Sequence, residues 1–304
     1  MTYSSLDSIF NARSLHPAKD LGYGGLEHFH FRCLQSSIFG RGFFPRKSHT
    51  STVLAVQTRS EDALESAMAR TLKSNATVLA ELNARIVNCE RCPRLRAYCA
   101  EVARVKRRAY LDHEYWGRPV PSFGDPMARV LILGLAPGAH GSNRTGRPFT
   151  GDGSGNFLYP ILYDAGFASQ PNATSRDDGM TLYGAQITSV VRCAPPGNKP
   201  LPEEIVNCAA YLDEEIAALT RLRVIVCLGK IAFDGYIAHL IRTGAIGRRG
   251  NLRFSHGAEF EVPQGRHLLA TYHPSLQNTN TGKLTAAMFL KVFQRARELA
   301  SNLP

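Results

Sequence analysis

From residue 129 onward, short apolar runs recur along the chain, each about as long as one β-strand. Runs of this length, bounded by glycine, proline or polar residues, are typical of strands buried on both faces of a parallel sheet. We expect four such strands, at Arg129 to Leu135, Tyr183 to Val191, Arg223 to Leu228 and His267 to Tyr272.

Segments with apolar residues at helical spacing precede, separate and follow these runs. The predicted helices are Glu61 to Val87, which contains no Gly or Pro, then Asn156 to Ala165, Glu203 to Leu219, Ile231 to Ile241 and Leu284 to Leu299. Strands that alternate with helices predict a doubly wound α/β sheet, which binds ligands at the carboxyl ends of its strands. The loops of interest therefore follow Leu135, Val191, Gly229 and Tyr272.

The composition is that of a folded, basic protein. Hydrophobic residues make up 44% of the 304 positions, and 36 Lys and Arg against 25 Asp and Glu give a formal net charge of +11. This balance favours a polyanionic partner such as nucleic acid or an anionic membrane surface. No uninterrupted apolar run reaches the roughly 18 to 20 residues of a membrane-spanning helix, so we expect a soluble protein without a membrane partner.

Residues 1–60 differ from the rest of the chain. They hold seven Lys and Arg against three acids, are rich in Ser, Gly and Phe, and show no sustained period. We expect a poorly ordered extension, followed by one domain over residues 61–304. Its composition would also suit organelle targeting, but a non-functional extension fits equally well. We expect a cytoplasmic protein, associated with the nucleoid if the source is prokaryotic, because seven cysteines suit a reducing compartment.

Four of the cysteines have the spacing of metal ligands. Cys89 and Cys92 form a C-x2-C pair, and Cys193 and Cys208 form a C-x14-C pair. Four thiolates suit either structural zinc or an iron–sulfur cluster, and the spacing does not choose between them. Alternatively, Cys193 and Cys208 are buried core thiols, or Cys99 replaces one ligand.

The loop after the first expected strand is rich in glycine, which lets the backbone approach a ligand closely. It contains no P-loop motif. Its distinctive side chains are Phe149, which suits stacking on a flat base, and Asp152, which suits orienting water or stabilising a cation. The alternatives are structural: Phe149 as a core anchor, and Asp152 as the N-cap of the next helix or a partner for Arg147.

His273 comes directly after the last expected strand, with Pro274 fixing the turn behind it. An imidazole at a strand end is well placed to donate a hydrogen bond to a leaving group. The polar loop that follows adds donors suited to phosphates, and Leu276 suits a wedge into a base stack.

Together these motifs resemble the uracil-DNA glycosylase superfamily, most closely its iron–sulfur families 4 and 5. The resemblance runs from about residue 80 to the carboxyl end and rests on the four cysteines and on the segments Gly134–Gly138, Pro148–Asp152, Val191–Pro200 and His273–Ser275. Leu135 and Ser189 stand where family 4 has Glu and Asn, and the segment His140–Arg147 resembles the signature of family 5, the type b enzymes. Ala136 stands where other branches have a water-activating Asp or Asn.

The resemblance implies a single three-layer α/β/α domain around a four-stranded, mainly parallel sheet, and excision of uracil, hypoxanthine and xanthine from double- and single-stranded DNA. It implies a [4Fe-4S] cluster, rather than zinc, on Cys89, Cys92, Cys193 and Cys208. We expect a monomer with catalytic Asp152 and His273, base-binding Gly134, Ala136, Phe149 and Asn198, and DNA-binding Arg144, Lys199, Ser275, Leu276 and Lys283.

Three other functions stay open on the sequence. A family 4-like enzyme would act on uracil alone, and a non-catalytic DNA-binding module would share the basic surface. A nucleotide-binding α/β protein would use the glycine-rich loop and be stabilised by free nucleotide.

Overall fold

A computed structural model describes residues 74–301 of the chain. The extension expected over residues 1–60 and the first part of the helix expected from Glu61 lie outside the described residues. Residues 74–87 form the second part of that helix, with Asn75, Leu79, Leu82 and Ile86 buried at helical spacing.

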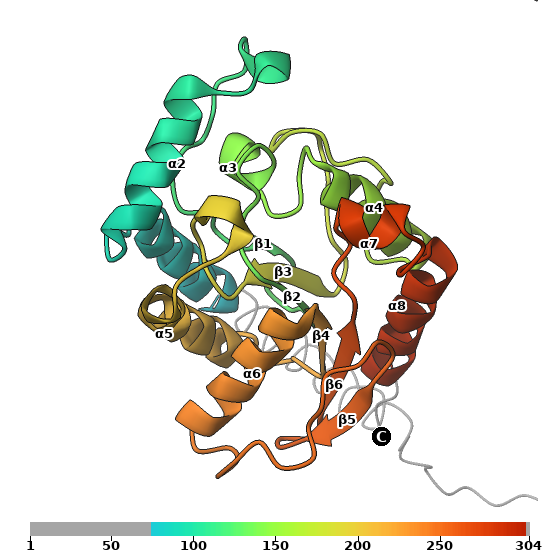
Figure 1. The fold of residues 1–304 in the computed structure, drawn as a ribbon. Helices are drawn as coiled ribbons and strands as arrows, with labels where there is room; N and C mark the ends of the chain where they lie inside the picture. Colours follow the sequence, from blue (N-terminus) through green and yellow to red (C-terminus); the bar gives the residue numbers. More distant parts are fainter. Residues whose placement is uncertain (1–73, 302–304) are drawn as a thin grey trace, which may run out of the picture. The chain divides into compact units, whose positions relative to one another are not determined.

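One mixed sheet of six strands, in the order β1-β3-β2-β4-β6-β5, forms the centre of the described residues (Figure 1). The four central strands are parallel and lie within the expected segments or within one residue of them: β2 (Val130–Gly134), β3 (Ala185–Ser189), β4 (Val224–Leu228) and β6 (Arg266–Thr271). The expectation of four strands was therefore incomplete. The two further strands, β1 (Phe123–Gly124) and β5 (Glu259–Val262), pair antiparallel at the sheet's two edges.

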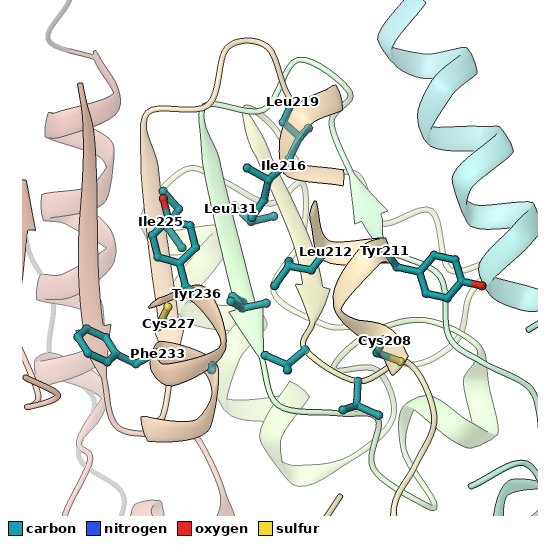
Figure 2. Close-up of a cluster of buried hydrophobic side chains, with 14 of the residues drawn as sticks. Leu131, Cys208, Tyr211, Leu212, Ile216, Leu219, Ile225, Cys227, Phe233 and Tyr236 are labelled. Atoms are coloured by element: carbon teal, nitrogen blue, oxygen red, sulfur yellow. The ribbon is translucent and has the colours of Figure 1, made fainter. Parts of the chain in front are cut away.

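Alternate residues of the parallel strands enter two separate cores. Leu131 and Ile225 face the core formed with α5 (Pro202–Ala218) and α6 (Lys230–Arg242). Ile132 and Val226 face the core formed with α4 (Gly153–Asp164) and α8 (Ala286–Ser301). Figure 2 shows the first core, in which side chains of α5 and α6 gather beside β2 and β4. Helices thus cover both faces of the sheet, as a three-layer α/β/α fold requires.

The predicted helices after residue 150 are all present, with small shifts of their ends. The helices of the described residues beyond position 90 are α2 (Pro93–Val105), α3 (Ser142–Thr145), α4 (Gly153–Asp164), α5 (Pro202–Ala218), α6 (Lys230–Arg242), α7 (Leu276–Asn280) and α8 (Ala286–Ser301), with 3-10 turns at Arg108–Tyr110 and Pro196–Asn198. The apolar pattern did not predict α2, because only Leu95 and Cys99 of this helix are buried. None of the described helices is long and apolar enough to cross a membrane.

The second core gives a test of the fold. Phe293 of α8 is fully buried and packs against Phe289 and Phe167, so Phe293→Ala leaves a cavity. We expect it to lower the free energy of unfolding in urea by about 3 to 5 kcal/mol. Val105→Ala, at a side chain that is 55% exposed, serves as the control and should change it by less than about 0.5 kcal/mol. Equal effects of the two substitutions would contradict this packing.

Candidate active site

A cavity of about 610 Å³ lies at the carboxyl ends of the parallel strands. Its walls come from the loops that follow β2, β3 and β6, from the segment before β1, and from the first turns of α4 and α7. The lining residues include Val120, Leu135, Ala136, Gly138, Ser142, Phe149, Asp152, Ser189, Arg192, Asn198, His273, Ser275, Leu276 and Gln277. Three of the four loops chosen from the sequence thus meet at one place, whereas the segment after Gly229 does not line the cavity.

Asp152 is the only carboxylate among the described residues that line this cavity. It caps α4, with its Oδ1 accepting a hydrogen bond from the Gly155 backbone N–H at 2.9 Å. Burial raises the pKa of Asp152, although the N–H groups of Gly155 and Ser154 and the charge of Arg144 oppose the rise. Asp152 is therefore a helix cap and, at the same time, a desolvated carboxylate facing the cavity.

Two glycines leave the space that this carboxylate occupies. A Cβ added at Gly141 would lie 1.9 Å from Asp152 Oδ2, and one added at Gly138 would lie 2.9 Å from the same oxygen. No side chain fits at Gly141 without moving the carboxylate. The sequence shows that the loop is rich in glycine, but it does not show that Gly141 contacts Asp152. The two residues are more than ten positions apart, and only the folded loop brings them together.

Phe149 adopts a left-handed backbone conformation, with φ of 52°. Its amide donates to Ser142 Oγ at 3.0 Å. A Cβ at Gly134 would lie 2.9 Å from the Phe149 ring, so the end of β2 must carry a glycine for the ring to reach its place. The ring centroid lies 5.8 Å from that of His273.

His273 lies two residues beyond the end of β6. Burial lowers its pKa to about 4, so the imidazole is neutral at physiological pH. Its backbone carbonyl accepts a hydrogen bond from Asn278 Nδ2 at 2.8 Å. Gly229 lies against it, since a Cβ there would be 3.2 Å from the His273 Cβ. A neutral imidazole carries one N–H donor and one acceptor.

The residues expected to contact DNA are not all at the cavity. Leu276 lines the cavity with 58% of its surface exposed, and Ser275 caps α7 beside it. Asn198 is exposed and lines the cavity too. Lys199 and Lys283 are exposed but do not line the cavity, and the Lys283 ammonium lies 4.7 Å from the centroid of the Tyr272 ring.

The structure does not support the expected contact of Arg144 with a phosphate. Its side chain is buried, its Nε donates to the His140 carbonyl at 2.8 Å, and its Nη2 donates to the Gly151 carbonyl at 2.6 Å. The guanidinium also lies 4.1 Å from the centroid of the Tyr110 ring. Arg144 therefore holds the glycine-rich loop together from within.

Arg147 pairs with Asp178 rather than with Asp152. The Arg147 side chain is buried and that of Asp178 is 9% exposed, and the guanidinium binds the carboxylate through two hydrogen bonds of 2.8 and 2.7 Å. Arg147 Nε donates to Thr150 Oγ1 at 2.9 Å. Arg147 therefore links Thr150, the residue after Phe149, to Asp178. Burial opposes ionisation of Asp178, but Arg147 and three backbone N–H groups lower its pKa to about 2.

Cys89, Cys92, Cys193 and Cys208 line one small enclosed space. Burial raises the pKa of the Cys92 and Cys208 thiols, and a hydrogen bond with Cys99 raises that of Cys193. Three arginines that line the same space oppose these rises: Arg91 acts on Cys92, Arg96 on Cys193 and Arg192 on Cys208. Among the described residues, no three His, Cys, Asp or Glu side chains are grouped as ligands of a single metal ion.

Neither of the remaining described cysteines joins this space. Cys99 is buried beside Cys193, and its thiol points to the Ala194 carbonyl at 3.7 Å. Cys227 is buried in β4.

Comparison with known proteins agrees with this geometry. A model of the Uracil DNA glycosylase superfamily matches residues 121–297. A Type-5 uracil-DNA glycosylase of Thermus thermophilus is 54% identical over 212 residues, which are 70% of this chain and 94% of the relative. A Type-5 uracil-DNA glycosylase of Mycobacterium tuberculosis is 47% identical over 230 residues, which are 75% of this chain and 84% of the relative. A Type-4 uracil-DNA glycosylase of Archaeoglobus fulgidus is 37% identical over only 114 residues.

The chain therefore belongs to the uracil-DNA glycosylase superfamily and, within it, to family 5. Both the expected family and the expected three-layer fold are confirmed.

The pair of Arg147 and Asp178 gives a prediction that depends on pH. Asp178→Asn leaves a buried guanidinium unpaired and should lower the free energy of unfolding at pH 7 by about 3 kcal/mol. Because the folded-state pKa of Asp178 is lowered to about 2 from 3.8, this contribution is present above 3.8 and is lost as the pH falls through 2. The difference between wild type and variant in urea unfolding should therefore be smaller at pH 3 than at pH 7. A difference that is constant with pH would show that the carboxylate's charge does not matter.

Proposed function

We propose that this chain excises uracil from DNA by hydrolysing the N-glycosidic bond of a flipped-out nucleotide in the cavity described above. Its membership in family 5 makes it a DNA glycosylase that acts in DNA repair. The observation that carries the proposed mechanism is the meeting of one desolvated carboxylate, one neutral imidazole and one aromatic ring in a single cavity.

The first step is binding of the base outside the duplex. Extruding a nucleotide costs a few kcal/mol, least for a mispaired base such as U opposite G or for single-stranded DNA. The Phe149 ring would stack on the extruded base, and Asn198 or nearby backbone groups would read its edge. Ala136 lines the cavity just beyond β2 with a small side chain, so a flat ring can approach the backbone there, and Gly134 leaves room for the Phe149 ring that would stack on it.

His273 would stabilise the departing base. Cleavage of the bond leaves negative charge on the base, and a neutral imidazole can donate its N–H to a carbonyl oxygen that gathers this charge. One preorganised donor of this kind contributes roughly 10²–10³ in rate. The pKa of about 4 keeps His273 in the neutral form over the physiological range.

Asp152 would act on the sugar side of the bond. The sugar develops oxocarbenium character as the base leaves, and a carboxylate can stabilise this cation or orient the attacking water. Ala136 supplies no acid or amide, so Asp152 is the one carboxylate of the described cavity lining that can do so.

DNA is the partner of this cavity. Leu276 protrudes at the cavity and would enter the base stack where the nucleotide has left. Ser275, Lys199 and Lys283 would contact phosphates, so affinity would fall with salt. We extend the proposal to double- and single-stranded DNA, to hypoxanthine and xanthine as further substrates, and to a monomer, since all the residues named here come from one chain.

The residues around the four cysteines fit a [4Fe-4S] cluster. Four thiols share one enclosed space, and three guanidinium groups face them, which complements an anionic group. When bound, the cluster would cross-link the segment before α2 to the β3–α5 connection and to α5 itself, so its contribution there is to hold the fold together.

Asp152→Asn tests the catalytic proposal. Asn caps a helix as well as Asp does, so the fold should survive while the charge is lost. We expect single-turnover uracil release from a U·G duplex to fall by about 10²–10⁴. Asp164→Asn, at an exposed carboxylate in the same helix, should leave the rate unchanged. Wild-type rates for Asp152→Asn in a folded protein would refute the proposed role.

The dependence of this rate on pH separates the two catalytic residues. Because burial raises the pKa of Asp152 and the charged form is the active one, the rate should fall with decreasing pH at a midpoint above the usual 3.8. His273→Gln should lower the whole profile and keep this midpoint. If the midpoint shifts in His273→Gln instead, the loss of activity at low pH would be due to protonation of the imidazole.

Iron analysis tests the proposed cofactor. We expect wild-type protein purified without oxygen to carry iron and acid-labile sulfide in equal amounts, and Cys193→Ser to lose most of both. Cys99→Ala, at a buried thiol outside the shared space, should retain them. If Cys99→Ala lost iron and Cys193→Ser retained it, Cys99 rather than Cys193 would be the cluster ligand.

A further inference from the structure

Arg192 lies between the two sites described above. It follows β3, directly precedes Cys193, and lines both the cavity that holds Asp152 and the space that holds the four cysteines. Its side chain is only 2% exposed. A guanidinium is always charged at neutral pH, and a buried charge of this kind needs a partner.

Glu215 is that partner and is itself fully buried. Its Oε2 accepts hydrogen bonds from Arg192 Nη2 at 2.5 Å and from Thr188 Oγ1 at 2.6 Å. Glu215 belongs to α5, the helix that carries Cys208, whereas Thr188 belongs to β3. The carboxylate therefore fixes the guanidinium between the sheet and the helix that bears one of the cysteines.

One donor of Arg192 has no partner in this arrangement. The Nε atom is completely buried and makes no hydrogen bond with the described residues. Buried polar groups are nearly always hydrogen-bonded, so an orphaned N–H calls for an acceptor supplied by a bound group. Arg192 lines the same small space as the four cysteines, and its backbone N–H donates to the Cys208 thiol, so the residue lies against the cysteines.

We propose that the Nε–H of Arg192 donates a hydrogen bond to the iron–sulfur cluster, and that Glu215 holds the guanidinium in place for it. The inference rests on the cluster proposed above. Arg192 is thus a positioning residue that joins the cluster to the wall of the catalytic cavity. Its role is distinct from that of Arg91 and Arg96, whose guanidinium groups also face the cysteines but contain no donor that is both fully buried and unpartnered.

Hydrogen bonds to cluster sulfurs and nearby positive charge favour the reduced form of a cluster, which is the more negative one. Outer hydrogen bonds also hold metal groups in place, and their loss typically costs 10–100-fold in affinity. Removing the Arg192 donor should therefore change two properties of the cluster itself, independently of any effect on DNA.

The experiment compares the double variant Arg192→Met/Glu215→Gln with wild type. The double variant removes both charges together, so no buried charge is left unpaired, and the introduced amide still offers an acceptor to Thr188. Arg192→Lys is a second variant, which keeps the charge and loses Nε. Glu214→Gln, at an exposed carboxylate in the same helix, is the control. The readouts are the midpoint potential of the cluster, iron release to a chelator, and the KM for a U·G duplex.

We expect both Arg192 variants to have a more negative midpoint potential and to release iron on the order of 10-fold faster, with Glu214→Gln unchanged. An unchanged potential and release rate in iron-loaded variants would overturn the inference. So would a raised KM with an unchanged cluster, because Nε would then bind substrate in the cavity. Wild-type protein without iron would refute the cofactor proposal itself, and the hydrogen bond with it.

Discussion

The close contact between the Asp152 carboxylate and the glycine-rich loop is the constraint on which the site depends. A carboxylate removed from water is unfavourable unless backbone N–H groups and charge compensate it, and here the first turn of α4 supplies the N–H groups. The carboxylate fits only because Gly141 and Gly138 have no side chains. The loop must therefore fold back onto the start of α4 to place Asp152 at the cavity. Asp152 is the only carboxylate among the described residues that line it.

Buried arginines hold this arrangement in place. Arg144 and Arg147 each bind the loop from inside, through backbone carbonyls in one case and through Asp178 and Thr150 in the other. Arg192 does the same for the β3–α5 connection through Glu215. The positive charge of this part of the chain is thus used largely for internal structure. Lys199 and Lys283, by contrast, are exposed to solvent.

The sequence allowed much of the fold to be predicted, because the central strands are apolar runs and the helices have a clear period. It did not reveal β1 and β5, since one is two residues long and the other has exposed Glu259 and Glu261 on an edge. Phe149, Asp152 and His273 could be chosen from the sequence because they lie in the loops that follow the expected strands. The roles of Arg144 and Gly141 depend on how the loop folds in space, which residue type and spacing alone do not specify.

The most direct test of this account is uracil release by Gly141→Ala, measured by alkaline strand cleavage of a labelled U·G duplex. Its added Cβ would collide with the Asp152 carboxylate, whereas Gly247→Ala adds a Cβ where nothing lies within 4 Å. We expect Gly141→Ala to lose most activity while its thermal unfolding stays close to wild type, and Gly247→Ala to keep full activity. Full activity in Gly141→Ala would contradict the claim that this contact places the catalytic carboxylate.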